Sequence, residues 1–464
     1  MNPSDIPSSQ RRGFLKALGG LTAGLAGFPT MLAAQSGANT PSRPSGAKYM
    51  GDFIAPKLEK VKVAIIGVGA RGPGHISQLA TIDGVEVVGI CDLVEARAKR
   101  SADNVTKKGH KPKVYFGDEN AWQKMLKETR PDAVIIATPW NLHAPMCIGA
   151  MKAGAHAFCE VPIAVTLEEM WDIVDTSEAT GRHCMMMENV NYGREELLYL
   201  NMCRLGVIGE LLHGEAAYIH ELRGQMENGD STGSWRTFQY AKRNGNLYPT
   251  HGLGPVAQYM NLARTEDTFG RMVSFSSPAK GRALYAKAST KLSNPEFKNL
   301  EFNGGDMSTS IIKTSLGRTI MVQWDETSPR PYSRHNLIQG TKGTLAGFPN
   351  RMAIEGVTKS YHEWAEDEAW EEIAAKYEHP LYKRMGELSK KMGGHGGMDF
   401  LMLFRIIECL QKGEPLDQNL YEGCFWSAVG PLSEKSVAED GMPQVFPDFT
   451  RGNWKTTKPL GIIS

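Results

Sequence analysis

Residues 61–72 read Val-Lys-Val-Ala-Ile-Ile-Gly-Val-Gly-Ala-Arg-Gly, an apolar run that passes directly into a Gly-x-Gly-x-x-Gly motif. A short apolar run bounded by glycine predicts a buried strand, and a helical stretch follows at residues 75–82. A second apolar run covers residues 85–91. Strand, glycine-rich turn, helix and strand in this order predict a dinucleotide-binding unit, whereas the glycine motif alone would indicate only a turn.

The glycines of this motif have separate expected tasks. Gly67 forms the tight turn, Gly69 lets the backbone approach a pyrophosphate, and Gly72 allows the helix to pack closely on the strand. Ala70 and Arg71 complete the turn at the amino end of the helix, where backbone amides attract phosphates.

An acidic residue at the end of the second strand indicates which dinucleotide binds. Asp92 lies about twenty residues beyond Gly72, where its carboxylate can accept hydrogen bonds from the ribose hydroxyls. Because a carboxylate repels a 2′-phosphate, the sequence favours NAD over NADP as the cofactor.

The alternation of strands and helices continues to about residue 160. Residues 113–115 and 132–138 read as strands, and residues 121–128 read as a helix. His143 and Glu160 lie at the carboxyl ends of predicted strands, where doubly wound sheets collect ligands. The sequence therefore predicts an α/β protein with a doubly wound Rossmann domain over residues 58–188.

The composition excludes some classes of function. The chain has 464 residues, and 52 Lys and Arg against 51 Asp and Glu leave a net charge of +1, which argues against a nucleic-acid-binding protein. The 41% hydrophobic and 22% charged content is that of a folded chain. The seven cysteines show no Cys-x-x-Cys spacing, so we expect buried, unpaired thiols and no metal site.

The first residues have the pattern of an export signal. Residues 9–16 read Ser-Gln-Arg-Arg-Gly-Phe-Leu-Lys, and an apolar, Gly/Ala-rich run follows to residue 34. Adjacent arginines before such a run resemble a twin-arginine signal, and glycines and Pro29 make a membrane anchor the weaker alternative. We therefore expect a signal at residues 1–34, a linker at residues 35–57, passage through the twin-arginine machinery, a periplasmic or exported bacterial product and no membrane insertion after processing.

The second half of the chain is expected to form an α+β domain over residues 189–464. Strand-like stretches occur at residues 209–222, 309–314 and 319–324, and a hairpin is expected at residues 336–347. These favour an open, largely antiparallel sheet that carries the substrate. Residues 361–391 read as charged helix, and His395 stands in a Gly-Gly-His-Gly-Gly turn before a late helix at about 396–412.

Three motifs resemble those of the glucose–fructose oxidoreductase and inositol dehydrogenase superfamily. They are the glycine-rich start, Ala-Thr-Pro-Trp-Asn-Leu-His at residues 137–143, and the segment 153–162 that ends in Cys-Glu-Val-Pro. The resemblance implies that Trp140, Asn141, His143, Glu160 and Val161 contact the cofactor, and that the late helix packs back on the Rossmann domain. The resemblance also implies a Glu-Lys-Pro motif at residues 160–162, where this chain has Glu-Val-Pro. Valine cannot carry a proton, and this difference argues against a simple sugar dehydrogenase.

Further motifs resemble those of the NAD-dependent α-N-acetylgalactosaminidases, family 109 of the glycoside hydrolases. They are residues 187–194 (Met-Glu-Asn-Val-Asn-Tyr-Gly-Arg), Trp235-Arg236, residues 248–255 (Tyr-Pro-Thr-His-Gly-Leu-Gly-Pro) and residues 331–335 (Pro-Tyr-Ser-Arg-His). The resemblance implies acid–base roles for Tyr192 and His251 and a cofactor contact for Asn189. The residues that it places on the sugar are Tyr218, Arg236, Tyr248, His251 and Tyr332.

This resemblance implies hydrolysis of terminal α-N-acetylgalactosamine by transient oxidation at C3, loss of the C2 proton, elimination, addition of water and reduction, with NAD regenerated. Two alternatives remain, a periplasmic sugar oxidoreductase of the same superfamily and an NAD-loaded sugar-binding protein without turnover. A glycosidase with two catalytic carboxylates is disfavoured, because the acidic residues form no recognisable pair. The sequence leaves open whether the protein forms a homo-oligomer.

Overall fold

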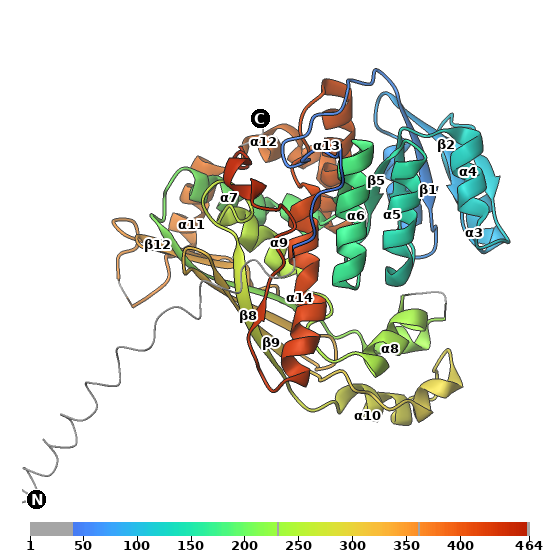
Figure 1. Ribbon diagram of the computed structural model, residues 1–464. Coiled ribbons are helices and arrows are strands. Elements are labelled where there is room, and N and C mark those ends of the chain that lie inside the picture. Colours follow the sequence, from blue (N-terminus) through green and yellow to red (C-terminus); the bar gives the residue numbers. More distant parts are fainter. Residues whose placement is uncertain (1–39, 230–231, 361, 462–464) are drawn as a thin grey trace, which may run out of the picture. The chain divides into compact units, whose positions relative to one another are not determined.

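Six parallel strands form the first sheet in the computed structural model, which describes residues 40–229, 232–360 and 362–461 (Figure 1). Their order across the sheet is β3-β2-β1-β4-β5-β6. The strands are β1 (Val61–Ile66), β2 (Val85–Cys91), β3 (Lys113–Tyr115), β4 (Ala133–Ile136), β5 (His156–Cys159) and β6 (Cys184–Met186). This order reverses at β1 and β4, which confirms the predicted doubly wound Rossmann fold.

Apolar residues on both faces of the central strands explain why helices cover both sides. In β1, Val63 and Ile65 belong to one buried cluster, while Ala64 and Ile66 belong to another. The helices of this half are α2 (Gly72–Leu79), α3 (Glu95–Thr106), α4 (Ala121–Thr129), α5 (His143–Lys152) and α6 (Leu167–Thr180). A parallel sheet is stable only when both of its faces are covered in this way.

The second half contains an eight-stranded sheet in the order β13-β12-β11-β7-β10-β9-β8-β14. All neighbouring strands are antiparallel except β7 and β10, which confirms the prediction of a largely antiparallel sheet. The strands are β7 (Leu211–Ile219), β8 (Phe269–Ser276), β9 (Ser308–Thr314), β10 (Thr319–Asp325), β11 (Leu337–Gly340), β12 (Gly343–Ala346), β13 (Arg351–Ile354) and β14 (Gln444–Val445).

Helices α9 and α14 pack against the second sheet, α9 on β7 and α14 on β8. The helices of this half are α7 (Arg194–Arg204), α8 (Gly233–Lys242), α9 (Thr250–Tyr259), α10 (Gly281–Ala288), α11 (Asp367–Tyr377), α12 (Pro380–Met392), α13 (Met398–Lys412) and α14 (Leu420–Ala438). Short 3-10 helices are η2 (Trp140–Leu142), η3 (Asn189–Tyr192), η4 (Arg223–Glu227), η5 (Pro295–Asn299), η6 (His395–Gly397) and η7 (Asn453–Thr456).

Two C-terminal helices pack against the first half of the chain, and one of them also reaches the second sheet. Helix α13 packs against α2 and β1 of the first half, and α14 contacts both β6 and β8. Helix α13 also follows the 3-10 turn η6, and Arg71 of the glycine-rich turn contacts His395 of η6 and Asp399 of α13, so residues late in the chain lie beside that turn. This return of the chain brings the two halves together around one site.

The stretch predicted as a linker includes packed residues. Arg43 forms an ion pair of 2.9 Å with Glu178, and Tyr49 stacks on Tyr421 at a ring-centroid distance of 4.8 Å. The predicted export signal lies outside the described residues. None of the helices in the described part of the chain is both long and apolar enough to cross a membrane.

All seven cysteines are unpaired, and all except the half-buried Cys203 are buried, as expected from their spacing.

Candidate functional site

The turn after β1 requires glycine at two positions. Gly67 has φ of +90°, in the left-handed region that side chains disfavour, and a Cβ on Gly72 would overlap the carbonyl oxygen of Gly67. A Cβ on Gly69, in contrast, would meet only Arg97, at 3.8 Å. The backbone at Gly69 is therefore open to a ligand, while its two neighbours in the motif shape the turn.

Asp92 fixes this turn from the end of β2. One carboxylate oxygen accepts a hydrogen bond from the backbone N–H of Val68 and the other from that of Val94, both at 2.8 Å. Each oxygen keeps a further lone pair for a hydroxyl donor. The carboxylate is thus held at the edge of the cleft.

A cleft of about 790 Å³ runs along the carboxyl ends of β1, β2, β4 and β5. A volume of this size lies in the range of small-molecule and cofactor sites. Two buried polar atoms on its walls, the indole Nε1 of Trp140 and the Nε of Arg236, have no hydrogen-bond partner among the residues that the structure describes. The predicted residues that line it are Gly67, Gly69, Ala70, Arg71, Asp92, Trp140, Asn141, His143, Glu160, Val161 and Arg236. Open glycine backbone, a carboxylate and unpartnered donors fit NAD.

The imidazole of His143 does not reach the cleft, although this residue contributes to its wall. Its Nδ1 lies 2.6 Å from the carbonyl oxygen of Pro162, and its Nε2 lies 2.9 Å from that of Thr138. The side chain is completely buried, and this burial lowers its pKa. His143 therefore holds together the loops that follow β4 and β5.

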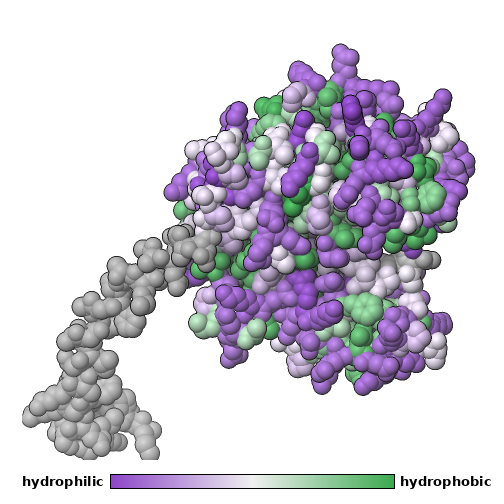
Figure 2. Space-filling model, turned by 45° about the vertical axis from the view of Figure 1, so that its right-hand side comes forward, coloured by the Kyte–Doolittle hydropathy of each residue, from purple (hydrophilic) through white to green (hydrophobic). Residues whose placement is uncertain are grey.

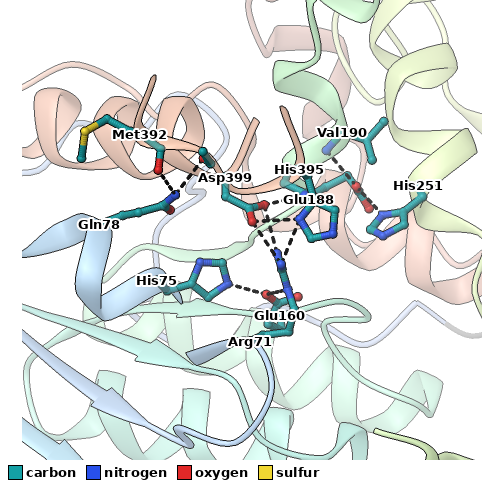
Figure 3. Close-up of polar contacts among 12 residues, drawn as sticks. Arg71, His75, Gln78, Glu160, Glu188, Val190, His251, Met392, His395 and Asp399 are labelled. Atoms are coloured by element: carbon teal, nitrogen blue, oxygen red, sulfur yellow. Dashed lines mark hydrogen bonds and ion pairs between the residues drawn. The ribbon is translucent and has the colours of Figure 1, made fainter. Parts of the chain in front are cut away.

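A cluster of charged side chains lies behind the glycine-rich turn (Figure 3). Arg71 donates to both carboxylate oxygens of Asp399 at 3.0 Å and to Glu160 at 3.1 Å. His75 lies 2.5 Å from Glu160, and His395 lies 2.9 Å from Asp399. Burial opposes ionisation of Glu160, but Arg71 and His75 outweigh it and lower the pKa of this carboxyl. This cluster ties the turn to the start of α13.

Asn189 belongs to this cluster instead of to the wall of the cleft. Its side-chain amide donates to Asp399 at 2.6 Å, and the residue is buried. Asn189 begins η3, directly after Glu188. It thereby connects the charged cluster with the next group of functional side chains.

The residues predicted to bind sugar form a second cluster, made of aromatic rings. The ring of Tyr218 lies 4.9 Å from Tyr248, 5.1 Å from His251 and 6.1 Å from Tyr332, measured between centroids. The guanidinium of Arg236 stands 4.9 Å from the ring of Tyr248. The same guanidinium lies 5.0 Å from the ring of Trp140 in the cofactor cleft, so Arg236 connects the cleft to the aromatic cluster.

His251 is held by a carboxylate that the sequence analysis did not single out. Its Nδ1 lies 2.7 Å from Oε1 of Glu188, which is completely buried (Figure 3). The second carboxylate oxygen of Glu188 has no hydrogen-bond partner in the described part of the chain. A histidine whose Nδ1 donates to a carboxylate presents Nε2 as the reactive nitrogen. Glu188 stands within a quoted motif, but only the packing of α9 on η3 shows its partner.

The hydroxyl of Tyr192 bonds to a residue outside this cluster. This hydroxyl donates at 3.1 Å to Asp417, and Asp417 also forms an ion pair of 2.9 Å with Arg405. The residue is buried, and burial together with Asp417 raises the pKa of its phenol well above the usual value. The structure therefore gives the hydroxyl of Tyr192 a position in a buried ionic network, and its acid–base role stays a prediction.

Burial also raises the pKa of the phenols of Tyr218 and Tyr248 far above the usual value. Both side chains consequently remain protonated at neutral pH and act as hydrogen-bond donors. His251 is then the member of the aromatic cluster best suited to take a proton.

In a comparison with known proteins, each half of the chain matches the model of a protein family. Residues 61–188 match the model of the oxidoreductase family with an NAD-binding Rossmann fold, and residues 192–456 match that of the glycosyl hydrolase 109 C-terminal domain. The fold resembles that of levoglucosan dehydrogenase in complex with NADH and levoglucosan, with a TM-score of 0.60 and 17% identity over 84% of this chain and all of that one.

Two relatives illustrate the similarity in sequence. The chain is 65% identical to glycosyl hydrolase family 109 protein 1 of Akkermansia muciniphila, over 91% of this chain and 89% of the relative. It is 55% identical to a protein of Shewanella oneidensis named alpha-N-acetylgalactosaminidase, over 98% of both chains. The chain therefore belongs to glycosyl hydrolase family 109, as a glycosidase with an NAD-binding Rossmann domain.

Proposed function

We propose that this glycosidase removes terminal α-N-acetylgalactosamine residues from glycans, with NAD regenerated in each turnover. The observation that carries the proposal is the Glu188–His251 pair, which lies in an aromatic cluster that Arg236 joins to the cofactor cleft. The Shewanella oneidensis relative named for this activity supports the choice of sugar.

When bound, NAD⁺ supplies reversible hydride transfer, which permits a transient ketone at C3 of the sugar and so acidifies the C2–H bond. His251 is the proposed base for that proton, through Nε2. Glu188 keeps Nδ1 protonated and stabilises the imidazolium that forms, because its carboxylate lies 2.7 Å away in a buried environment. The C1–O bond then breaks as a C1–C2 double bond forms, and the departing glycosidic oxygen takes up a proton. Water adds at C1 while a proton returns to C2.

The remaining residues of the cluster orient the sugar. Tyr218 and Tyr248 donate hydrogen bonds from protonated hydroxyls, and Arg236 offers further donors beside the ring of Tyr248. Tyr332 is 39% exposed and stands at the outer edge of the cluster. Val161, which is buried, carries no proton, so the acid–base chemistry depends on the histidine.

Hydrolysis of nitrophenyl α-N-acetylgalactosaminide in deuterated water tests the proposal. Release of nitrophenol with deuterium at C2 of the recovered sugar is the expected result. Release without deuterium at C2 would contradict the elimination route, and no release would contradict the glycosidase specificity. Net accumulation of NADH with free sugar would instead support the sugar oxidoreductase.

We also propose that the protein is exported by the twin-arginine route and reaches the periplasm already folded with NAD. Arg11 and Arg12, which precede the apolar run, support this route, although they lie outside the described residues. In a cell-fractionation experiment, the full chain should be periplasmic and the double variant Arg11→Lys/Arg12→Lys should remain in the cytoplasm. Equal export of the two proteins would contradict the proposal.

A further inference from the structure

A second cavity, of about 340 Å³, meets the charged cluster at His395, whereas the cofactor cleft meets it at Arg71 and Glu160. Its walls come from η3, the start of α7, the end of α12 and the Gly-Gly-His-Gly-Gly turn, together with Arg334. None of the residues predicted to bind sugar lines it, and of those assigned a catalytic role only Tyr192 does.

Hydrogen bonds connect this cavity to both functional clusters. On one wall, His395 lies 3.0 Å from Arg71 of the cofactor cleft and 2.9 Å from Asp399. On the opposite wall, Arg334 donates at 2.7 Å to the hydroxyl of Tyr332, which belongs to the aromatic cluster. The cavity therefore borders the position where the sugar would be held.

The turn that carries His395 has an unusual backbone. Each of the five residues from Gly393 to Gly397 has positive φ, and His395 itself has φ of +46°. A Cβ on Gly394 would lie 2.7 Å from Nε2 of Gln78, and one on Gly397 would lie 2.7 Å from the backbone of Ser389. Only glycine fits on either side, so the turn is built to hold a half-exposed histidine at this wall.

Donors and acceptors without partners lie in the cavity wall. The side chain of Arg334 is nine-tenths buried, yet its Nε makes no hydrogen bond to any described residue. Glu196 is more deeply buried, and within the same part of the chain its Oε2 has no partner, although Oε1 pairs with Arg334 at 2.6 Å. Buried polar atoms of both kinds are normally satisfied, so their presence together indicates a ligand with donors and acceptors of its own.

The composition of the walls indicates a neutral polyol in preference to an ion. Arg194 pairs at 2.8 Å with Glu378, which does not line the cavity, and the remaining charges, Arg334 and Lys390 against Glu195 and Glu196, are balanced. Lys390 stands 5.7 Å from the ring of Tyr382. Mixed charges with one aromatic face can bind the hydroxyls and a C–H face of a sugar ring. A volume of about 340 Å³ is at the lower end of the range of small-molecule sites.

We propose that this cavity is the subsite for the leaving group, and that it accepts a sugar residue linked to the terminal N-acetylgalactosamine. The proposal rests on the proposed function, since a leaving group exists only if the protein cleaves a glycoside. His395 then stands at the junction of the two subsites, between the cavity and the charged cluster behind the glycine-rich turn.

Two substrates that differ only in the leaving group test this subsite. One is a disaccharide in which α-N-acetylgalactosamine is linked to a second hexose, and the other is α-N-acetylgalactosaminyl fluoride, whose leaving group does not fill the cavity. The variants are Lys390→Ala and Glu195→Gln in the cavity wall. Lys383→Ala is the matched control, because Lys383 is exposed on the same helix and does not line the cavity.

The cavity variants should lower kcat/KM for the disaccharide about tenfold and leave that for the fluoride within about twofold. The control should change neither. Equal losses on both substrates, or no loss on the disaccharide, would overturn the leaving-group subsite while the proposed function stands. Failure of the unmodified enzyme to release fluoride would overturn the proposed function itself.

Discussion

The two polar clusters at the end of the cofactor cleft are built on different principles. In the charged cluster, Arg71 meets Glu160 and Asp399, and each of these charges has an opposite charge within 3.1 Å. In the aromatic cluster, Glu188 keeps an oxygen without a partner beside His251, and Arg236 keeps an unpartnered Nε. Satisfied charges fix a backbone position, whereas unsatisfied polar atoms leave binding capacity for a ligand.

Replacing His251 with glutamine should break the aromatic cluster's function while it keeps an amide N–H that can donate to the buried Glu188. His251→Gln should lower kcat about 10³-fold, because a general base contributes typically 10²–10⁴-fold to such a step. Hydrolysis of the nitrophenyl glycoside measures the loss, and deuterium incorporation at C2 should fall with it.

The matched control is His362→Gln, an exposed histidine outside both clusters. It should retain full activity. A His251→Gln enzyme with more than a tenth of the original rate would remove the histidine from the base role.

The charged cluster should respond in the opposite way, with a loss of stability. Asp399→Asn removes the carboxylate that Arg71 and Asn189 contact and leaves a largely buried guanidinium with less compensation. Breaking such a pair costs about 3 kcal/mol in the free energy of unfolding, which denaturant titration can measure. Glu387→Gln, on an exposed surface of α12, should cost less than about 0.5 kcal/mol. A loss of the same small size for Asp399→Asn would show that the cluster does not fix the turn.

The difference between the two clusters also explains what the sequence could predict. The Rossmann half follows from local signals, since strand, turn and helix are contiguous around Gly67 and each apolar run marks one buried strand. Tyr248 and His251 lie in a motif and Tyr218 follows only from the family resemblance, and the structure brings the three together. Asp399 has no such local signal, because its partner Arg71 is 328 residues away in the chain.

Tyr192 illustrates a different limit of sequence reasoning. It was assigned an acid–base role with its motif, but the direction of a side chain in a short 3-10 helix depends on tertiary packing. Here that packing sends its hydroxyl to Asp417. Glu188, from the same motif, points to His251 instead. A motif therefore predicts which segment reaches a site, and the packing decides which of its side chains does so.

Lowering the pH should separate the contribution that buried histidines make to the free energy of unfolding from the contribution of the charged cluster. Burial lowers the pKa of His156 to about 4 and that of His183 to about 3, and the two rings lie 5.0 Å apart. The unfolded chain, with ordinary values near 6.5, then binds more protons below pH 6.5, so stability falls as the pH drops towards 4. At pH 5 the free energy of unfolding should be about 2 kcal/mol lower for each of the two histidines.

The carboxyl groups of the charged cluster titrate at a lower pH than ordinary carboxyl groups. The pKa of Glu160 and that of Asp399 are both lowered, although burial opposes this, so their contribution is present above the ordinary carboxyl values and is lost only in stronger acid. Denaturant unfolding measures the free energy of unfolding at pH 7 and at pH 5. The difference between these two free energies should be smaller for His156→Gln than for the unmodified protein. An unchanged difference would assign the acid sensitivity to other groups.

The smallest expected effect tests the sugar contacts alone. Tyr218→Phe keeps the ring that packs against Tyr248 and His251 and removes only the hydroxyl, which lies 3.2 Å from His220. Loss of one hydrogen bond to the sugar should raise KM about three- to tenfold with little change in kcat, since a net hydrogen bond contributes about 1 kcal/mol. Tyr199→Phe is the control, because its hydroxyl donates to a backbone carbonyl away from the site, so KM should stay constant while stability falls slightly. If both variants changed KM alike, or if Tyr218→Phe lowered kcat alone, the aromatic cluster would act on the rate of the reaction and not on the position of the sugar.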